Sequence, residues 1–233
     1  MTRDAAGRAR LHSRVRRSRA VDLAGRPRDH DPVTVPDVRV AFLGDSFTAG
    51  VGDPTALGWT GRVVARARAA GADLTSYPLG VRRETTRDVQ RRFLAETAPR
   101  LRDGEAHGVV LATGVNDTTI EDGARRSTAA DSVAALGEML DAARWPVLVV
   151  GPALVADPAQ NERIAELSRQ LHDCCAARGT GYVEVAAALA GDAGWPAEVA
   201  AVDGAHPGAA GYARLAELVW PAFAGWLEER TAG

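Results

Sequence analysis

Short apolar runs alternate strictly with amphipathic stretches of helical length from Val38 to the end of the chain. The apolar runs predict buried strands at 38–43, 74–79, 109–113, 147–150 and 182–185. The intervening stretches, with apolar residues three or four apart, predict helices at 59–70, 85–101, 124–143, 158–178 and 208–229. Because parallel strands need long crossover connections, this alternation predicts an α/β fold with a parallel sheet covered by helices on both faces.

The domain organisation follows from length and composition. With 233 residues and 46% hydrophobic content, the chain can bury a sizeable core, and α/β folds of this length are commonly one domain. We therefore expect a single domain over residues 37–233. Residues 1–36 are rich in arginine and poor in apolar anchors, which predicts a flexible tail. A nucleic-acid arm or a transit peptide are alternatives, although four aspartates dilute the positive charge of this segment.

Composition also excludes several classes of function. The net charge of −2 provides no global field for nucleic acid or anionic lipid. All 28 basic residues are arginine, which rules out a lysine Schiff base. No stretch reads as a secretory signal or a membrane span, so we expect a cytoplasmic protein without integral membrane association. Cys174 and Cys175 are adjacent in a predicted helix, where a disulfide is geometrically awkward, and without a partner motif we expect two buried thiols and not a redox or metal site. Nothing in the sequence specifies an oligomeric state.

Polar residues follow the predicted strands at the edge where ligands bind in such folds. Ser46 follows the first strand, Gly80 the second and Asn116 the third, while Asp203 and His206 lie in the loop before the last helix. Because the carboxyl ends of parallel strands meet at one edge of the sheet, we expect these loops to converge there.

The first of these loops, residues 44–50, reads Gly-Asp-Ser-Phe-Thr-Ala-Gly. Its small residues indicate a sharp bend that exposes the Ser46 hydroxyl, with backbone N–H groups placed to face a developing oxyanion. Two alternatives are a phosphate-binding turn and a helix N-cap. The usual glycine-rich phosphate patterns are, however, missing here.

The last loop, Asp-Gly-Ala-His-Pro at 203–207, supplies what a serine nucleophile needs. An imidazole removes the hydroxyl proton, and a carboxylate fixes the tautomer of that imidazole. Asp203 can fold back onto His206, and Pro207 restricts the histidine backbone. The alternative is an Asp-Gly turn followed by a histidine without a catalytic role. None of the other four histidines is placed like a base.

Three further positions are candidates for the site. Asn116 follows a buried strand and could donate its amide N–H to an oxyanion, the alternative being an Asx cap in a turn. Gly80 could offer its backbone N–H, the alternative being a glycine that ends a strand. Arg82 and Arg83 could line the pocket and favour an anionic group, the alternative being solvated surface arginines.

Taken together, these residues resemble the SGNH, or GDSL-type, hydrolase superfamily, whose four short blocks occur here in order. Ser46 is similar to the nucleophile of that family, Gly80 and Asn116 to its oxyanion donors, and Asp203 with His206 to its last block. The resemblance implies a three-layer αβα sandwich of flavodoxin-like type that needs no metal or organic cofactor.

This chain departs from the family pattern in the block around Ser46 and in the block around Gly80. Phe47 stands where the eponymous leucine of the family stands, which conserves apolar character. Pro78 stands where family members often have Asn, and Arg82-Arg83 replace a Ser-Gly or similar pair.

The sequence therefore predicts a serine esterase. We expect it to hydrolyse short-chain esters of sugars, metabolites or small lipids through an acyl-enzyme, with the N–H groups of Ser46, Gly80 and Asn116 holding the oxyanion. An acyltransferase using the same site is one alternative. A flavodoxin-like module that binds phosphate or a nucleotide is another, and an inactive scaffold that binds a protein partner is a third.

Overall fold

The sheet confirms the predicted α/β fold. In the computed structural model, which describes residues 35–231, five parallel strands pair in the order β2-β1-β3-β6-β7. Their bounds are β1 (Val38–Gly44), β2 (Leu74–Gly80), β3 (Ala106–Ala112), β6 (Val147–Val150) and β7 (Gly181–Val183). The strand order reverses between β1 and β3, which is where ligands bind in open α/β sheets. The predicted Arg-rich tail lies, as far as residue 34, outside the described residues.

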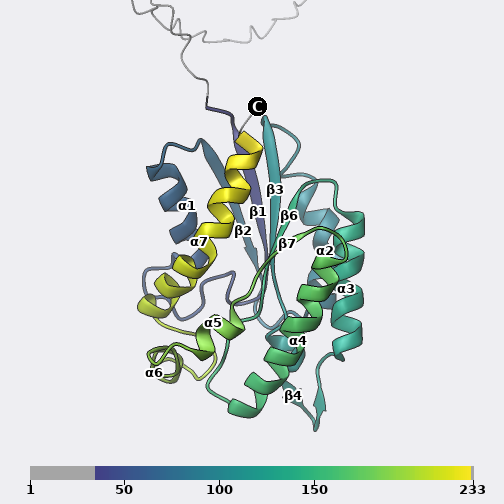
Figure 1. The fold of residues 1–233 in the computed structure, drawn as a ribbon, viewed down its shortest axis with the longest axis vertical. Helices are drawn as coiled ribbons and strands as arrows, with labels where there is room; N and C mark the ends of the chain where they lie inside the picture. The colour runs from purple at the N-terminus through teal and green to yellow at the C-terminus, as the bar shows by residue number, and fades with distance from the viewer. Residues whose placement is uncertain (1–34, 232–233) are drawn as a thin grey trace, which may run out of the picture. The chain divides into compact units, whose positions relative to one another are not determined.

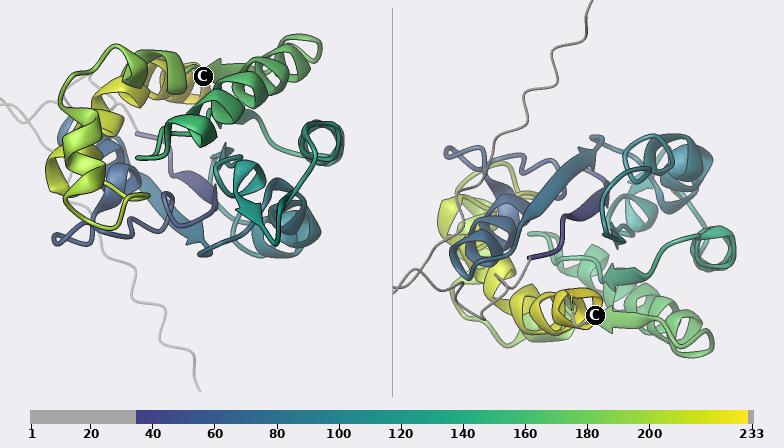
Figure 2. Two further views of the ribbon diagram at one scale, coloured as in Figure 1. Left: turned by 90° about the horizontal axis from the view of Figure 1, so that it is seen from below. Right: turned by 90° about the horizontal axis from the view of Figure 1, so that it is seen from above.

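Helices cover both faces of this sheet. Figure 1 shows α1 (Gly58–Ala69) and α7 (Ala209–Thr231) on one side, and the end-on views of Figure 2 show the same separation. The other side carries α2 (Thr86–Thr97), α3 (Ala129–Ala142) and α4 (Pro158–Ala176). The three-layer αβα arrangement expected from the resemblance is therefore confirmed.

The central strand β1 explains why two helical layers are needed. Val40 and Phe42 pack among the side chains of α1 and α7, whereas Ala41 and Leu43 pack among those of α2, α3 and α4. All four side chains are buried. Because successive side chains of a strand point to opposite faces, an apolar run such as this one must be covered on both sides.

Local sequence signals set where the helices on the second face begin. Thr85 accepts a hydrogen bond from the backbone N–H of Asp88, and the Asp88 side chain accepts one from the backbone of Thr85, which forms a capping box for α2. Thr128 caps α3 and Asp157 caps α4. The predicted helix start at residue 124 is therefore wrong, since a hairpin of β4 (Ile120–Glu121) and β5 (Ala124–Arg125) precedes α3.

Three short helical elements were not predicted. They are η1 (Asn116–Thr118), α5 (Ala186–Ala190) and α6 (Trp195–Ala200). Each is too short for helical periodicity to stand out in the sequence. Cys174 and Cys175 are free and buried in α4, as predicted. No helix within residues 35–231 is long and apolar enough to cross a membrane.

The packing of α7 on β3 makes a stability prediction. A Cβ atom added at Gly108 would lie 2.1 Å from the Trp226 ring, whereas one added at Gly225 in α7 would meet nothing within 4 Å. We expect Gly108→Ala to lower the free energy of unfolding by about 1–3 kcal/mol through overpacking. Gly225→Ala should raise it by up to about 1 kcal/mol through helix propensity. Urea unfolding followed by tryptophan fluorescence measures both, and equal stability of the two variants would contradict this packing.

Candidate active site

Three strands end side by side, and this places the candidate site. Gly44 of β1 is in register with Gly80 of β2 on one side and with Ala112 of β3 on the other. The loops that continue from these three residues carry Ser46, the Gly80 backbone and Asn116. The predicted convergence of the loops after the first three strands is confirmed.

Glycine is required at two of these strand ends because the turn after β1 folds tightly over them. A Cβ atom at Gly80 would lie 2.3 Å from the Ala49 nitrogen and 2.6 Å from the Asp45 carbonyl oxygen. A Cβ atom at Gly44 would lie 2.2 Å from the Ala112 carbonyl oxygen. Only residues without a side chain let the turn that carries Ser46 rest on the neighbouring strands.

Ser46, His206 and Asp203 form a continuous chain of hydrogen bonds. The Ser46 Oγ lies 2.7 Å from Nε2 of His206, and Nδ1 of the same ring lies 2.8 Å from Oδ2 of Asp203. The other oxygen of Asp203 accepts the backbone N–H groups of Ala205 at 3.0 Å and His206 at 2.8 Å. The Asp203 loop thus folds back on the imidazole, as the sequence predicts.

These contacts assign the roles of the two ring nitrogens. Burial acts to raise the pKa of Asp203, but the hydrogen bonds from the backbone and ring of His206 outweigh it and lower that pKa to about 2. An ionised carboxylate accepts only, so Nδ1 of His206 carries the proton and Nε2 accepts from the serine hydroxyl. The expectation of an exposed hydroxyl is wrong, since Ser46 is only 5% exposed beside the imidazole.

The loop that contains Gly52 and Asp53 packs against His206. It follows the nucleophile turn, which spans residues 45–50 around Ser46. Gly52 has φ +90, and a Cβ atom there would lie 3.1 Å from Cβ of His206. The loop is fixed by Asp53, which accepts from the Gly58 N–H at 2.8 Å and pairs with Arg62. Although burial opposes it, this ion pair, with further hydrogen bonds, holds the pKa of Asp53 well below its usual range. The loop therefore restricts how far the imidazole can move.

Asn116 contacts the turn that carries Ser46, and both hydrogens of its amide point at protein acceptors. Nδ2 donates to the Glu84 carbonyl oxygen at 2.9 Å and to Oδ2 of Asp45 at 3.3 Å. Within residues 35–231, the backbone N–H of Ser46 donates to no acceptor. The shorter Asn116 bond orients the amide, and the longer one is the weaker of the two.

Asp45 is the buried acid of this site, with 1% of its surface exposed. Its Oδ1 accepts the backbone N–H of Phe47 at 2.9 Å. Burial raises the pKa of Asp45 to about 7, and the nearby carboxylates of Asp117 and Glu84 act in the same direction. Asp45 therefore differs from Asp203, whose hydrogen bonds keep it ionised at neutral pH.

The predicted pocket arginines are both exposed. Arg83 forms an ion pair with Glu121 of the β4–β5 hairpin, and its backbone has φ +68. Arg82 has no ion-pair partner in the part of the chain that the structure describes. Neither residue lines the cavity beside the nucleophile turn. A role for them in substrate binding stays a prediction.

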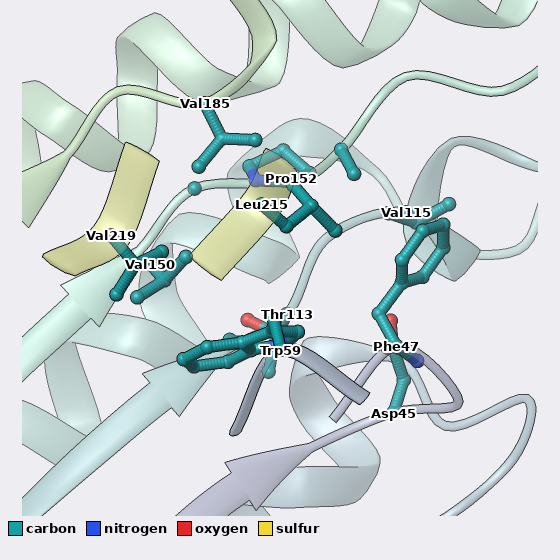
Figure 3. Close-up of a pocket in the computed structure, with 13 residues that line it drawn as sticks. Asp45, Phe47, Trp59, Thr113, Val115, Val150, Pro152, Val185, Leu215 and Val219 are labelled. Carbon is teal, nitrogen blue, oxygen red and sulfur yellow. Dashed lines mark hydrogen bonds between the residues drawn. The ribbon is translucent and has the colours of Figure 1, made fainter. Parts of the chain in front are cut away.

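That cavity lies between the nucleophile turn, the ends of β3 and β6, and helix α7. Figure 3 shows Phe47 beside Val115, with Leu215 and Val219 of α7 on the other side of the space. Its lining is mostly apolar, and Asp45 and Thr113 are its only acidic or hydroxyl side chains. Phe47, which lines this cavity, also packs against the ring of His206, with 5.3 Å between the ring centroids.

Several site residues were not predicted, because no sequence signal marks them. Asp53 and Arg62 are nine positions apart and resemble any other acid and base, and Gly52 is one glycine of 24. Only Asp45, inside the Gly-Asp-Ser turn, stood next to a predicted residue. Among residues 35–231, no group of three or more His, Cys, Asp or Glu side chains is placed to hold a metal ion.

Comparisons with known proteins agree with this geometry. A model of the GDSL-like lipase/acylhydrolase family matches residues 42–214. A lipase/acylhydrolase from Enterococcus faecalis has a similar solved structure, with 24% identity and a TM-score of 0.69 over 80% of this chain and 95% of that chain. The structure of TesA gives 26% identity and a TM-score of 0.64 over 79% and 97% of the two chains.

A third similar structure is Axe2, an acetylxylan esterase from Geobacillus stearothermophilus, with 20% identity and a TM-score of 0.62 over 78% of this chain and 92% of that chain. No curated protein matches the chain. The family match extends from β1, just before Ser46, through the Asp203 loop and into α7. The chain belongs to the GDSL-like lipase/acylhydrolase family, also called SGNH hydrolases, and is a serine hydrolase that acts on esters.

Proposed function

We propose that the protein hydrolyses short-chain carboxylic esters through an acyl-enzyme on Ser46. The observation that carries this proposal is the contact of 2.7 Å between the Ser46 hydroxyl and Nε2 of His206. A serine hydroxyl is a weak nucleophile until a base takes its proton, and this imidazole is oriented for that task by Asp203. Membership of an acylhydrolase family supports the same chemistry.

The reaction proceeds in two halves. Nε2 of His206 takes the proton of Ser46 as Oγ attacks the ester carbonyl, and the same proton then passes to the departing alkoxide. This step breaks the ester C–O bond and leaves the acyl group on Ser46. A water molecule gives its proton to His206 and attacks the acyl-enzyme, and the proton returns to Oγ when the acid leaves. Asp203 stabilises the imidazolium in both halves.

Two N–H donors of the predicted set hold the negative charge of the tetrahedral intermediates. The Ser46 N–H has no acceptor among the described residues, and Asn116 adds its side-chain amide. The Gly80 N–H is not placed for this role, because the carbonyl of the same peptide faces β1 and the N–H points away from that strand. The amide reaches the oxyanion by exchanging its longer bond to Asp45, while the bond to the Glu84 carbonyl keeps its plane fixed. The donors are thus in place before the charge develops, which is what makes such a site effective.

The first test compares the wild type with variants on short-chain p-nitrophenyl esters. Ser46→Ala should lower kcat at least about a thousandfold because the nucleophile is lost. Asn116→Ala should lower it roughly a hundredfold because one oxyanion donor is lost. Ser76→Ala, a serine in β2 away from the site, is the matched control and should leave kcat unchanged.

The outcome also separates the alternatives. Full activity of Ser46→Ala would overturn the proposal, and so would wild-type protein that neither cleaves these esters nor reacts with a fluorophosphonate. Product analysis in the presence of acceptor alcohols measures acyl transfer. We expect free acid as the main product, and a predominance of transferred ester would instead identify an acyltransferase.

The cavity in Figure 3 supports the proposed preference for short acyl groups. It is apolar and adjoins the nucleophile turn, and little free space remains among its lining side chains. Val219→Ala should enlarge it and raise the relative kcat/KM for longer acyl chains about fourfold per added methylene, since each buried methylene contributes about 0.8 kcal/mol. Val63→Ala truncates the same residue type in the same core without lining the cavity, and is the control. Equal chain-length profiles would contradict an acyl-binding role.

The buried acid predicts a pH dependence of stability. Asp45 titrates near 4 in the unfolded chain and at about 7 in the folded protein, so between these values the folded protein binds the extra proton. This contribution to stability is lost progressively as the pH rises from about 4 to about 7. Relative to the wild type, Asp45→Asn should therefore gain stability between pH 5 and pH 8, by at most about 3 kcal/mol. Urea unfolding at each pH measures the difference.

Asp53→Asn provides the control with the opposite sign. The pKa of Asp53 is lowered, so its contribution is lost only below the usual carboxyl range. Its difference from the wild type should stay constant between pH 5 and pH 8. A constant difference for Asp45→Asn as well would show that Asp45 does not titrate in this range.

A further inference from the structure

We propose that Arg92 of α2 is a positioning residue for the oxyanion-stabilising donors. This inference rests on the proposed function and adds a residue to its machinery. Arg92 lies far from the nucleophile in sequence and belongs to no motif, yet its guanidinium reaches the backbone at the ends of both β1 and β2.

The guanidinium makes three hydrogen bonds. Its Nη2 donates to the Leu79 carbonyl oxygen at 2.8 Å and to the Gly44 carbonyl oxygen at 3.0 Å. Its Nε donates to Oε2 of Glu84 at 2.7 Å. The side chains of Arg92 and Glu84 are only 17% and 18% exposed, so the surrounding protein shields this ion pair from water.

The bond to Leu79 joins the end of β2 to the end of β1. The Gly44 carbonyl accepts the Val81 N–H, so in this parallel register the Leu79 carbonyl also faces β1. Because the C=O and N–H of a trans peptide point in opposite directions, the Gly80 N–H points away from β1. Arg92 therefore acts on the proposed donors through the strand ends that carry them, and not through the Gly80 N–H.

The other two bonds reach the segments that carry the Ser46 and Asn116 donors. Gly44 stands two residues before Ser46, so holding its carbonyl fixes the start of the nucleophile turn. Glu84 joins Arg92 through its carboxylate and accepts the Asn116 amide through its backbone carbonyl at 2.9 Å. One side chain is thus linked to the segments that carry both donors.

Simple satisfaction of strand-end carbonyls does not account for this arrangement. The Gly44 carbonyl already accepts the backbone N–H of Val81 at 3.0 Å, so it would keep a partner without Arg92. The guanidinium instead joins carbonyls of two different strands, at the level where both continue into the site. Arg92 therefore fixes the position of the end of β1 relative to the end of β2.

The test measures kcat and KM for Arg92→Lys and Arg92→Ala, with the concentration of active enzyme determined by fluorophosphonate titration. We expect kcat per titrated site to fall by about tenfold to a hundredfold, because a small misplacement of donors weakens transition-state stabilisation. KM should change less than about threefold, since ground-state binding does not use these donors. Arg91→Ala is the matched control, because Arg91 is the exposed neighbour on α2 and, among residues 35–231, pairs only with Asp88.

Two measurements separate positioning from a stabilising role. Arg92→Ala in the Asn116→Ala background should cost less than in the wild type, because the two residues act through the same donor set. Added guanidinium chloride at low concentration should restore part of kcat to Arg92→Ala and none to Asn116→Ala. Arg92→Lys keeps the charge and carries the kinetic test if Arg92→Ala does not fold.

The outcomes distinguish this inference from the proposed function. Wild-type kcat per titrated site in Arg92→Lys and Arg92→Ala, with only the melting temperature reduced, would overturn the positioning role and leave the esterase proposal intact. Fully additive effects with Asn116→Ala would also overturn it. Absence of Ser46-dependent ester cleavage in the wild type would instead overturn the proposed function, and the Arg92 inference with it.

Discussion

The register of three parallel strands is the constraint on which the site depends. Gly44, Gly80 and Ala112 end their strands at one level, and the nucleophile turn lies over two of them at distances that only glycine permits. A slip of one residue would turn every side chain of β1 to the opposite face, so Phe42 would enter the layer that now packs against Ala41 and Leu43, and core packing therefore helps to fix the register. The same strand register is therefore needed both to pack the core and to align the donors at the sheet edge.

The sequence predicted most of what local signals and chain order determine. Alternating apolar runs predicted the sheet, and the Asp203 loop predicted its own contact with His206 because both residues lie within one short turn. Long-range placement was predicted only as the convergence of loops at one sheet edge, and the individual contacts made there were not. Burial of the Ser46 hydroxyl depends on His206, 160 positions away, and Arg92 touches Gly44 across 48 positions. No periodicity or spacing rule relates residues that meet only after the layers assemble.

Environment gives two aspartates of the site opposite properties. Asp203 accepts three N–H groups in a partly exposed loop and stays ionised, which suits a residue that must stabilise an imidazolium. Asp45 is buried near Asp117 and Glu84, which raises its pKa. A buried carboxyl with a reduced tendency to ionise is a weaker acceptor for the Asn116 amide than a full carboxylate. In the proposed mechanism, that weakness helps the amide to exchange Asp45 for a developing oxyanion.

This difference explains why the rest of the site must be held so firmly. If the Asn116 amide exchanges one of its two partners during turnover, its plane has to be kept by the other, the Glu84 carbonyl. Glu84 is in turn held through its carboxylate by Arg92, which also holds the ends of β1 and β2. During turnover, only the hydrogen bond from Asn116 to Asp45 then has to break. The other hydrogen bonds that position the donors keep their partners at the strand ends. Catalysis by prearranged donors requires this division, because donors that moved together with the charge would lose their advantage over water.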